Sequence, residues 1–321
     1  MKSTFHEYKI DLSSSKKRMT KHLLSEEPKK SFRTWLRFKR KDMKTFFQQI
    51  FHHELLNKIE KHCVFIGYPR SEHTLVAALL DAHPNMVISK GVDPLQYVGR
   101  GFKLSQIYSL YLTRAQRFVK KGSKSNGYSY FVPNQWNGKF NQLKVIGDKS
   151  GDLLSKRLLE NPGILDRFLI EYQAKHKFIH VIRNPFDSIS TLSARNKMTL
   201  EEATTYYFAL CGKVGKARIN IAQENWFDIK LEDLIADPQA WLARLCQFLG
   251  QETTANYLQD CSSVVFKSAR QTRFTAQWTH RLIGSVETEV AKYPWLSNYS
   301  FESAGQLLNQ ESWRGNEASA L

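Results

Sequence analysis

The segment CVFIGYPRSEHTLVAALLDAHP at residues 63–84 predicts a strand, a turn and a helix in one continuous run. Its first four residues are apolar and partly β-branched, which is typical of a strand buried in a parallel sheet. Gly67 and Pro69 end the strand, and apolar residues return from Leu75 at a spacing near the helical period. Such a turn directs unpaired backbone N–H groups and the positive end of a helix dipole to one point. The segment therefore predicts an anion-binding turn.

The spacing from Gly67 to Thr74 is that of a Walker A loop, G-x-x-x-x-G-K-[ST], with two exceptions. Glu72 stands where the second glycine belongs, and His73 replaces the lysine. Because a nucleotide triphosphatase needs that lysine on its phosphates, the loop argues against an ATPase or a kinase. Glu72 predicts strain where glycine allows a positive φ, and repulsion of a bound phosphate. Either its side chain points outward, or the site is weakened.

The sequence FIHVIRNPFDSIST, which ends at Thr191, predicts a second strand followed by a helix. Asn184 is a favourable N-cap and Pro185 a favourable first helical residue. Arg183 therefore lies at the end of the strand, and Ser190 and Thr191 lie about two turns inside the helix.

These stretches resemble the sulfotransferases, which transfer a sulfuryl group from 3′-phosphoadenosine 5′-phosphosulfate (PAPS). The turn at residues 67–74 is similar to the family's 5′-phosphosulfate loop, and Arg183 with its hydroxyl residue eight positions later is similar to the 3′-phosphate site. Residues 227–250 resemble the family's late strand and helix, and the basic residues before Trp278 and residues 293–296 resemble its closing segment. The resemblance runs from about residue 63 to residue 299.

The resemblance implies a nucleotide site that binds PAPS, and its product PAP, without a metal. The implied nucleotide-binding residues come from several parts of the chain: Arg70, Ser71, His73, Thr74, Arg183, Ser190, Thr191, Lys267, Arg270 and Arg273. Negative charge grows on the leaving phosphate during transfer, so fixed cations are needed there. Arg70 and Lys149 are the candidate catalytic cations. A surface salt bridge for either, and an ordinary strand-end role for Arg183, are the alternatives.

The acceptor also needs a general base, and both positions where relatives carry one hold glycine here, at Gly91 and Gly151. The local substitutes are Asp93, His73 and Glu72. Capping of a turn is the alternative role of Asp93, and donation to phosphate is the alternative role of a neutral His73. Two other carboxylates are expected to make structural contacts near the helix starts, because they would repel phosphates: Asp187 and Glu232.

The composition of the chain bears on its partners, the state of its thiols and its location. The chain has 321 residues and a net charge of +17, which predicts an acidic partner such as a nucleotide, a sulfated or carboxylated substrate, nucleic acid or an anionic membrane. Its four cysteines form no C-x-x-C pair, which indicates reduced thiols. No stretch approaches about 18 consecutive apolar residues, and no apolar leader is visible. We therefore expect a soluble, cytoplasmic protein.

The chain is expected to divide into a basic N-terminal part, residues 1–60, and a sulfotransferase-like α/β domain, residues 61–321. Residues 1–30 are polar and predict a mobile arm, and residues 31–62 predict a basic amphipathic helix. That helix either packs on the domain or contacts an anionic membrane or a nucleic acid. Asn57 replaces the second histidine of an H-E-x-x-H motif, so no metal site is predicted.

The remaining pattern alternates strands with helices. Further strands are expected at residues 86–89, 143–146 and 226–231, and helices at residues 104–119, 153–159, 164–174, 199–224 and 241–249. The aromatic stretch 122–138 is too long for a simple connection and predicts a substrate-side loop. This alternation predicts a three-layer P-loop-type α/β fold with a parallel sheet flanked by helices.

Two functions follow. The leading one is transfer of a sulfuryl group from PAPS to a hydroxyl or amine of a small-molecule or glycan acceptor. The alternative is a catalytically weakened relative that binds PAP or another anion and docks on membrane or nucleic acid through its basic arm.

Overall fold

The computed structural model describes residues 28–125 and 128–303. The chain divides into two compact units, Met1–Phe47 and Gln48–Leu321. Of the first unit, the described residues belong to one helix, α2 (Pro28–Phe51), which extends into the second unit and which the amphipathic pattern predicted. A short helix, α3 (His53–Asn57), follows it. The predicted mobile arm lies almost entirely outside the described residues.

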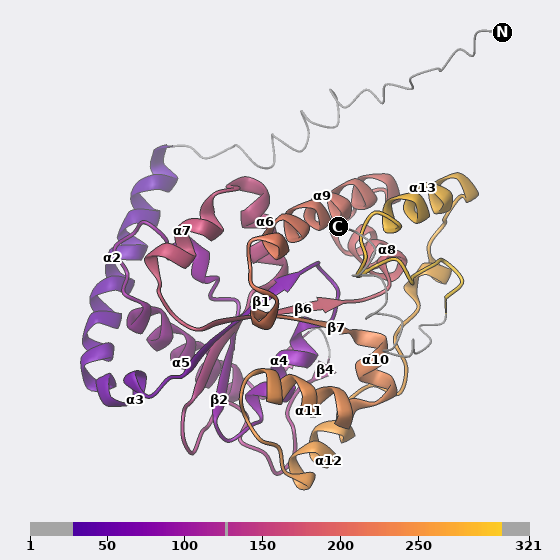
Figure 1. The fold of residues 1–321 in the computed structure, drawn as a ribbon. Coiled ribbons are helices and arrows are strands. Elements are labelled where there is room, and N and C mark those ends of the chain that lie inside the picture. The colour runs from indigo at the N-terminus through magenta and orange to yellow at the C-terminus, as the bar shows by residue number, and fades with distance from the viewer. Residues whose placement is uncertain (1–27, 126–127, 304–321) are drawn as a thin grey trace, which may run out of the picture. The chain divides into compact units, whose positions relative to one another are not determined.

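A parallel sheet of five strands is the frame of the second unit (Figure 1). The strands lie side by side in the order β2-β5-β1-β6-β7. Their bounds are Lys61–Gly67 for β1, Met86–Lys90 for β2, Val145–Lys149 for β5, His176–Ile182 for β6 and Trp226–Lys230 for β7. The predicted fold class is confirmed.

Strand β1 lies at the centre because its side chains are apolar on both faces. From His62 to Gly67 every residue is buried, as parallel strands covered by helices on two sides require. On one side β1 pairs with β5, and on the other with β6. The chain forms β1, β2 and β5 first and then adds β6 and β7 on the other side of β1, so the order of the strands reverses at β1. In open α/β sheets a ligand binds at the carboxyl ends of the strands beside such a point.

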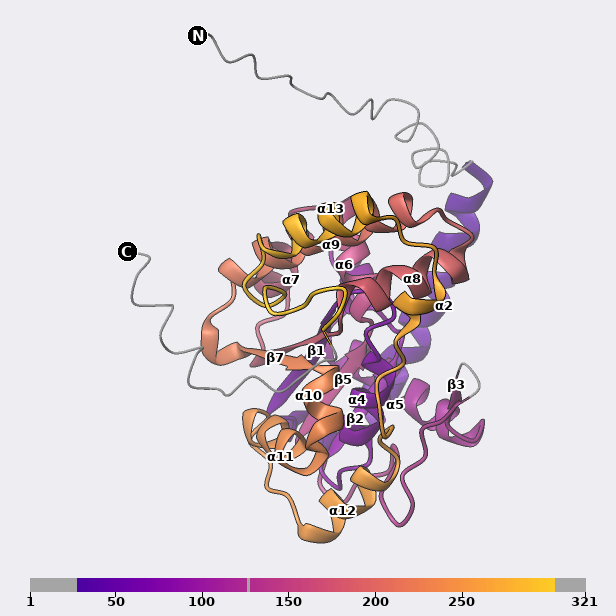
Figure 2. The same cartoon turned by 90° about the vertical axis from the view of Figure 1, so that its right-hand side faces the viewer.

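Helices cover both faces of the sheet (Figure 1). On one face α4 (His73–Asp81), α11 (Pro238–Phe248) and α12 (Ala255–Ser263) share an apolar cluster with Cys63 and Phe65 of β1. On the other face α6 (Gly151–Glu160) and α9 (Leu200–Ile219) pack against β1. Figure 2 shows α9 above the strands and α11 and α12 below them. The core is therefore two apolar layers separated by the sheet.

The remaining described elements are η1 (Pro94–Tyr97), α5 (Leu104–Lys120), β3 (Lys124–Ser125), β4 (Tyr128–Ser129), α7 (Ile164–Glu171), α8 (Pro185–Asn196), η2 (Gln223–Asn225), α10 (Leu231–Ala236), η3 (Thr272–Thr275) and α13 (His280–Val290). The third large strand begins two residues later than predicted and continues to Lys149. Its pairing with β2 from Met86 to Lys90 sets these bounds, and that partner is remote in sequence. The four cysteines are buried and free, as predicted.

Candidate functional site

The turn between β1 and α4 contains two residues in the left-handed backbone region. The φ angle is 69° at Arg70 and 60° at Glu72, values that non-glycine residues rarely adopt. The strain predicted at Glu72 is therefore confirmed. Ser71 Oγ is buried and has no hydrogen-bond partner in the part of the chain that the structure describes. Buried polar atoms without a partner are uncommon in folded proteins.

Arg183 connects two loops that are far apart in sequence. Its Nη1 donates to the carbonyl oxygen of Arg70 at 3.0 Å, and its Nη2 donates to the carbonyl oxygen of Arg270. Its Nε is buried without a partner among the described residues. Only 3% of Arg183 is exposed, and no described carboxylate forms an ion pair with it. A buried guanidinium in this state favours an anionic ligand.

The start of α8 has the predicted cap. Asn184 Oδ1 accepts from the backbone N–H of Phe186 at 2.9 Å, and Pro185 is the first helical residue. The backbone N–H of Asn184 donates to Glu232 Oε1 at 2.9 Å, and Glu232 Oε2 accepts from the Tyr299 hydroxyl at 2.7 Å. Glu232 therefore makes the structural contacts that were expected of it.

The two predicted hydroxyl residues of α8 bind the segment that follows α12. Ser190 Oγ accepts from Trp278 Nε1 at 2.9 Å. Thr191 Oγ1 lies 3.0 Å from Thr272 Oγ1. Both hydroxyls therefore help to hold residues 272–278 against α8.

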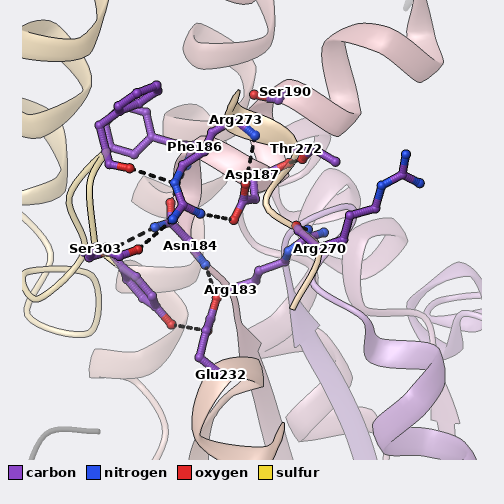
Figure 3. A network of polar contacts seen from close by, with 12 residues as sticks. Arg183, Asn184, Phe186, Asp187, Ser190, Glu232, Arg270, Thr272, Arg273 and Ser303 are labelled. Atoms are coloured by element: carbon purple, nitrogen blue, oxygen red, sulfur yellow. Dashed lines mark hydrogen bonds and ion pairs between the residues drawn. The ribbon is translucent and has the colours of Figure 1, made fainter. Parts of the chain in front are cut away.

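Arg273 has a different role from the predicted one (Figure 3). Its three guanidinium nitrogens all donate to protein acceptors: Nε to the Phe301 carbonyl at 2.7 Å, Nη1 to Asp187 Oδ2 at 2.6 Å, and Nη2 to the Ser303 carbonyl at 2.7 Å. Its backbone N–H also donates to Asp187 Oδ1 at 2.9 Å. Arg273 therefore has a protein partner for each guanidinium nitrogen, whereas Arg183 Nε has none among the described residues. Arg273 fixes the loop that carries Arg270.

A pocket of about 750 Å³ opens between these elements. Five predicted nucleotide-binding residues line it: Arg70, Arg183, Ser190, Thr191 and Arg270. Lys267 is exposed and does not line it, although its neighbours Phe266 and Ser268 do. Tyr128 and Tyr130 from the predicted substrate-side loop form another part of the wall. The pocket thus has a basic wall and an aromatic wall.

A second pocket of about 210 Å³ lies against the same turn. Its walls include Arg70, Thr74 and Lys149, so both predicted catalytic cations face it. Lys149 ends β5 and pairs in register with Lys90 of β2. Glu72 and Tyr130 line this pocket and the larger one. Glu72 therefore faces the two pockets, and the suggestion that it points outward is not supported.

His73 also lines the smaller pocket, but its ring is packed beneath the turn. Its Nε2 lies 3.4 Å from the Ile66 carbonyl oxygen. Burial, assisted by the nearby charge of Lys149, lowers the pKa of His73 to about 3. A Cβ added at Gly151 would lie 2.6 Å from His73 Nε2. His73 thus fills the space that a side chain at position 151 would need, and it stays neutral at pH 7.

Asp93 lies outside both pockets. Its Oδ2 accepts from Arg157 Nε at 2.8 Å and Nη2 at 2.6 Å. Its backbone N–H donates to Asp148 Oδ2 and Ser150 Oγ. Burial raises the pKa of Asp93 to about 6 even though Arg157 opposes the shift. These contacts favour the alternative reading of Asp93 as a structural turn residue.

Several wall residues were not predicted. Ala194 and Arg195 line the larger pocket, whereas Leu192 and Asn196 line the smaller one. Helical spacing could have found Arg195, which is one turn beyond Thr191 on the same face. Asp152, in the first turn of α6, also lines the smaller pocket, and no signal in the sequence assigned it there.

Residues 162–255 match a family model described as the sulfotransferase family. This part of the chain is similar to the sulfotransferase family. It contains the strand that precedes Arg183 and the helix with Ser190 and Thr191, so the predicted resemblance is confirmed. A comparison with curated proteins gave no match.

Solved sulfotransferase structures are also similar to the chain. Sulfotransferase STF9 from Mycobacterium avium is 12% identical, with a TM-score of 0.48 over 82% of this chain and 83% of that one. The sulfotransferase domain of the Synechococcus PCC 7002 olefin synthase is 17% identical, with a TM-score of 0.43 over 77% and 91%. Mouse sulfotransferase SULT7A1, complexed with PAP, is 9% identical, with a TM-score of 0.41 over 77% and 88%.

Among the residues that the structure describes, no helix combines the length and apolarity that crossing a membrane demands.

Proposed function

We propose that the chain transfers a sulfuryl group from PAPS to a hydroxyl or amine of a small-molecule or glycan acceptor. The observation that carries this proposal is Arg183, a buried guanidinium in the wall of the larger pocket with an unpartnered Nε. Arg70 and Arg270 add positive charge to the same wall. These groups fit a nucleotide with two separate phosphate groups.

The chain's own residues would hold this nucleotide in two places. The turn from Arg70 to Thr74, with its unpartnered Ser71 hydroxyl, would bind the 5′ end. Arg183 and the hydroxyls of α8 would bind the 3′-phosphate. Lys149 faces the turn from the smaller pocket and would neutralise the leaving phosphate together with Arg70. PAPS supplies the activated sulfuryl group.

The binding test compares PAP with AMP, which lacks the 3′-phosphate, by isothermal titration calorimetry. The protein is expected to prefer PAP to both AMP and ATP, and Arg183→Ala is expected to weaken PAP much more than AMP. Arg183→Lys, which keeps the charge but lacks the several N–H donors of the guanidinium, should give an intermediate loss of PAP affinity. Lys216→Ala removes an exposed charge on α9 that lines neither pocket and serves as the control. Equal affinity of the unaltered protein for PAP and AMP would refute the 3′-phosphate assignment.

A second candidate is a PAP-binding protein without turnover. The carboxylate of Glu72 in the pocket walls favours it, because like charge weakens binding of a phosphosulfate. This candidate includes docking of the basic N-terminal part on an anionic membrane or nucleic acid, which removal of residues 1–60 would abolish. A screen of acceptors with labelled PAPS separates the two functions, since transfer at an ordinary turnover rate excludes the second.

A further inference from the structure

Glu72 occupies a backbone conformation that costs free energy, and its side chain faces both pockets. A non-glycine residue in the left-handed region costs about 1–3 kcal/mol when the surroundings hold it there, and such residues cluster at functional sites. Glycine would remove both the strain and the negative charge. The conformation of Glu72, with a φ of 60°, therefore indicates that the carboxylate has a use.

We infer that Glu72 is the general base that takes the proton from the acceptor, which enters through the smaller pocket. This inference rests on the proposed sulfuryl transfer. Glu72 lies in the wall shared by the two pockets. On one side is the larger, arginine-rich pocket, and on the other is the smaller pocket with Lys149. A base at this boundary can reach an acceptor on the side opposite to the nucleotide.

The smaller pocket suits a polar part of an acceptor. Its volume of about 210 Å³ is below the usual range for whole drug-sized ligands, about 300–1,000 Å³. It therefore takes one end of an acceptor, such as a single sugar ring. Asp152 and Asn196 supply hydrogen-bond acceptors or donors at its wall, beside Lys149. A hydroxyl-rich group matches this wall better than a flat apolar phenol does.

Tyr130 positions the carboxylate. Its hydroxyl lies 3.5 Å from Glu72 Oε2, at the long end of a hydrogen bond. Tyr130 is 4% exposed and lines both pockets, so its ring limits where the Glu72 side chain goes. Among the described residues no other hydrogen bond to the Glu72 carboxylate is present. Oε1 is therefore free to accept a proton.

Other candidates for the base are less suitable. His73 is buried against the Ile66 carbonyl and is neutral, with its ring closed in by Gly67 and Gly151. Asp93 is paired with Arg157 outside both pockets. Asp152 lines the smaller pocket but not the larger one, so it does not lie at the boundary between the acceptor and the nucleotide.

The reaction step balances as follows. The acceptor oxygen forms a bond to sulfur while its proton passes to a Glu72 carboxylate oxygen. The bond from sulfur to the bridging phosphate oxygen breaks, and its electron pair stays on the phosphate of the departing PAP. Arg70 and Lys149 neutralise that charge. No oxidant, reductant or further reactant is needed.

The test uses Glu72→Gln, Glu72→Asp and Asp152→Asn in the full chain. Transfer from labelled PAPS is measured with glucosamine, cellobiose and p-nitrophenol, and PAP affinity is measured by calorimetry. Glu72→Gln is expected to lower kcat by about 10²–10⁴-fold, the usual contribution of a general base, with PAP affinity unchanged or tighter. Glu72→Asp should recover part of the rate. Asp152→Asn should raise KM for a sugar acceptor and retain kcat.

Three outcomes separate the possibilities. If Glu72→Gln binds PAP more tightly and keeps its kcat, Glu72 only weakens the nucleotide site and the inference is refuted. PAP binding without transfer to any of the three acceptors also overturns it, but leaves the nucleotide site intact. Failure to bind PAP refutes the proposed function itself.

Discussion

The buried ion pair between Asp187 and Arg273 offers a quantitative test of how the nucleotide loop is held. Asp187 is 1% exposed and Arg273 2%. Asp187→Asn keeps the shape of the side chain but replaces one acceptor oxygen by a donor NH₂. One of its two hydrogen bonds, to Arg273 Nη1 or to the Arg273 backbone N–H, is therefore lost. The guanidinium keeps its charge in a site with little water to screen it.

The magnitude follows from this burial. Removal of one partner of a buried ion pair costs about 3–5 kcal/mol. We expect the lower end, about 3 kcal/mol, because asparagine keeps one hydrogen bond and the carbonyls of Phe301 and Ser303 still accept from Arg273. The loop that presents Arg270 should also loosen, so affinity for PAP should fall although residue 187 does not line the pocket.

The assay is urea unfolding at pH 7 followed by fluorescence, together with PAP titration of the folded variants. Glu289→Gln is the matched control, because it breaks an exposed ion pair with Lys292 at 2.5 Å. Exposed pairs of this kind contribute less than about 1 kcal/mol. The reasoning is refuted if Asp187→Asn loses no more free energy of unfolding than Glu289→Gln.

Two further predictions concern buried histidines. His62 Nδ1 lies 3.0 Å from His176 Nδ1, and burial lowers the pKa of both histidines. The unfolded chain therefore binds more protons than the folded chain below about pH 6.5, the usual pKa of histidine. Above that pH the two histidines do not reduce the free energy of unfolding, and below it each lowers that free energy by about 1.4 kcal/mol per pH unit. His62→Phe should make the fall in urea midpoint between pH 7 and 5.5 shallower, and an unchanged slope would argue against this account. Gly151→Ala should cost about 1–3 kcal/mol by overpacking against the His73 ring. That cost should vanish in a His73→Ala background, and equal costs in the two backgrounds would show that the contact is unimportant.

Local features of the sequence determined where several strands and helices of the α/β fold begin and end. The apolar run in β1, the cap and proline that begin α8 and the glycine that ends β1 act over a few residues, so their effects are visible without a partner. The same holds for the strain at Glu72, because a Cβ in the place of a glycine is a local property of the turn. The positions of Arg183 after a strand and of Thr191 about two turns into the next helix were predicted for this reason, whereas their role in nucleotide binding was implied by the resemblance to sulfotransferases.

Only the tertiary structure decided which basic residues are free. Arg270 and Arg273 are three residues apart and look equivalent in the sequence, yet one lines the pocket and the other is held by Asp187 and two carbonyls. The fate of a guanidinium depends on acceptors that the fold brings from remote segments. In the same way, burial against Ile66 and Gly151 makes His73 a neutral group, and the fold places Glu72 in the walls of two pockets. Desolvation and long-range contacts cause these effects, and neither can be inferred from the spacing of residues along the chain.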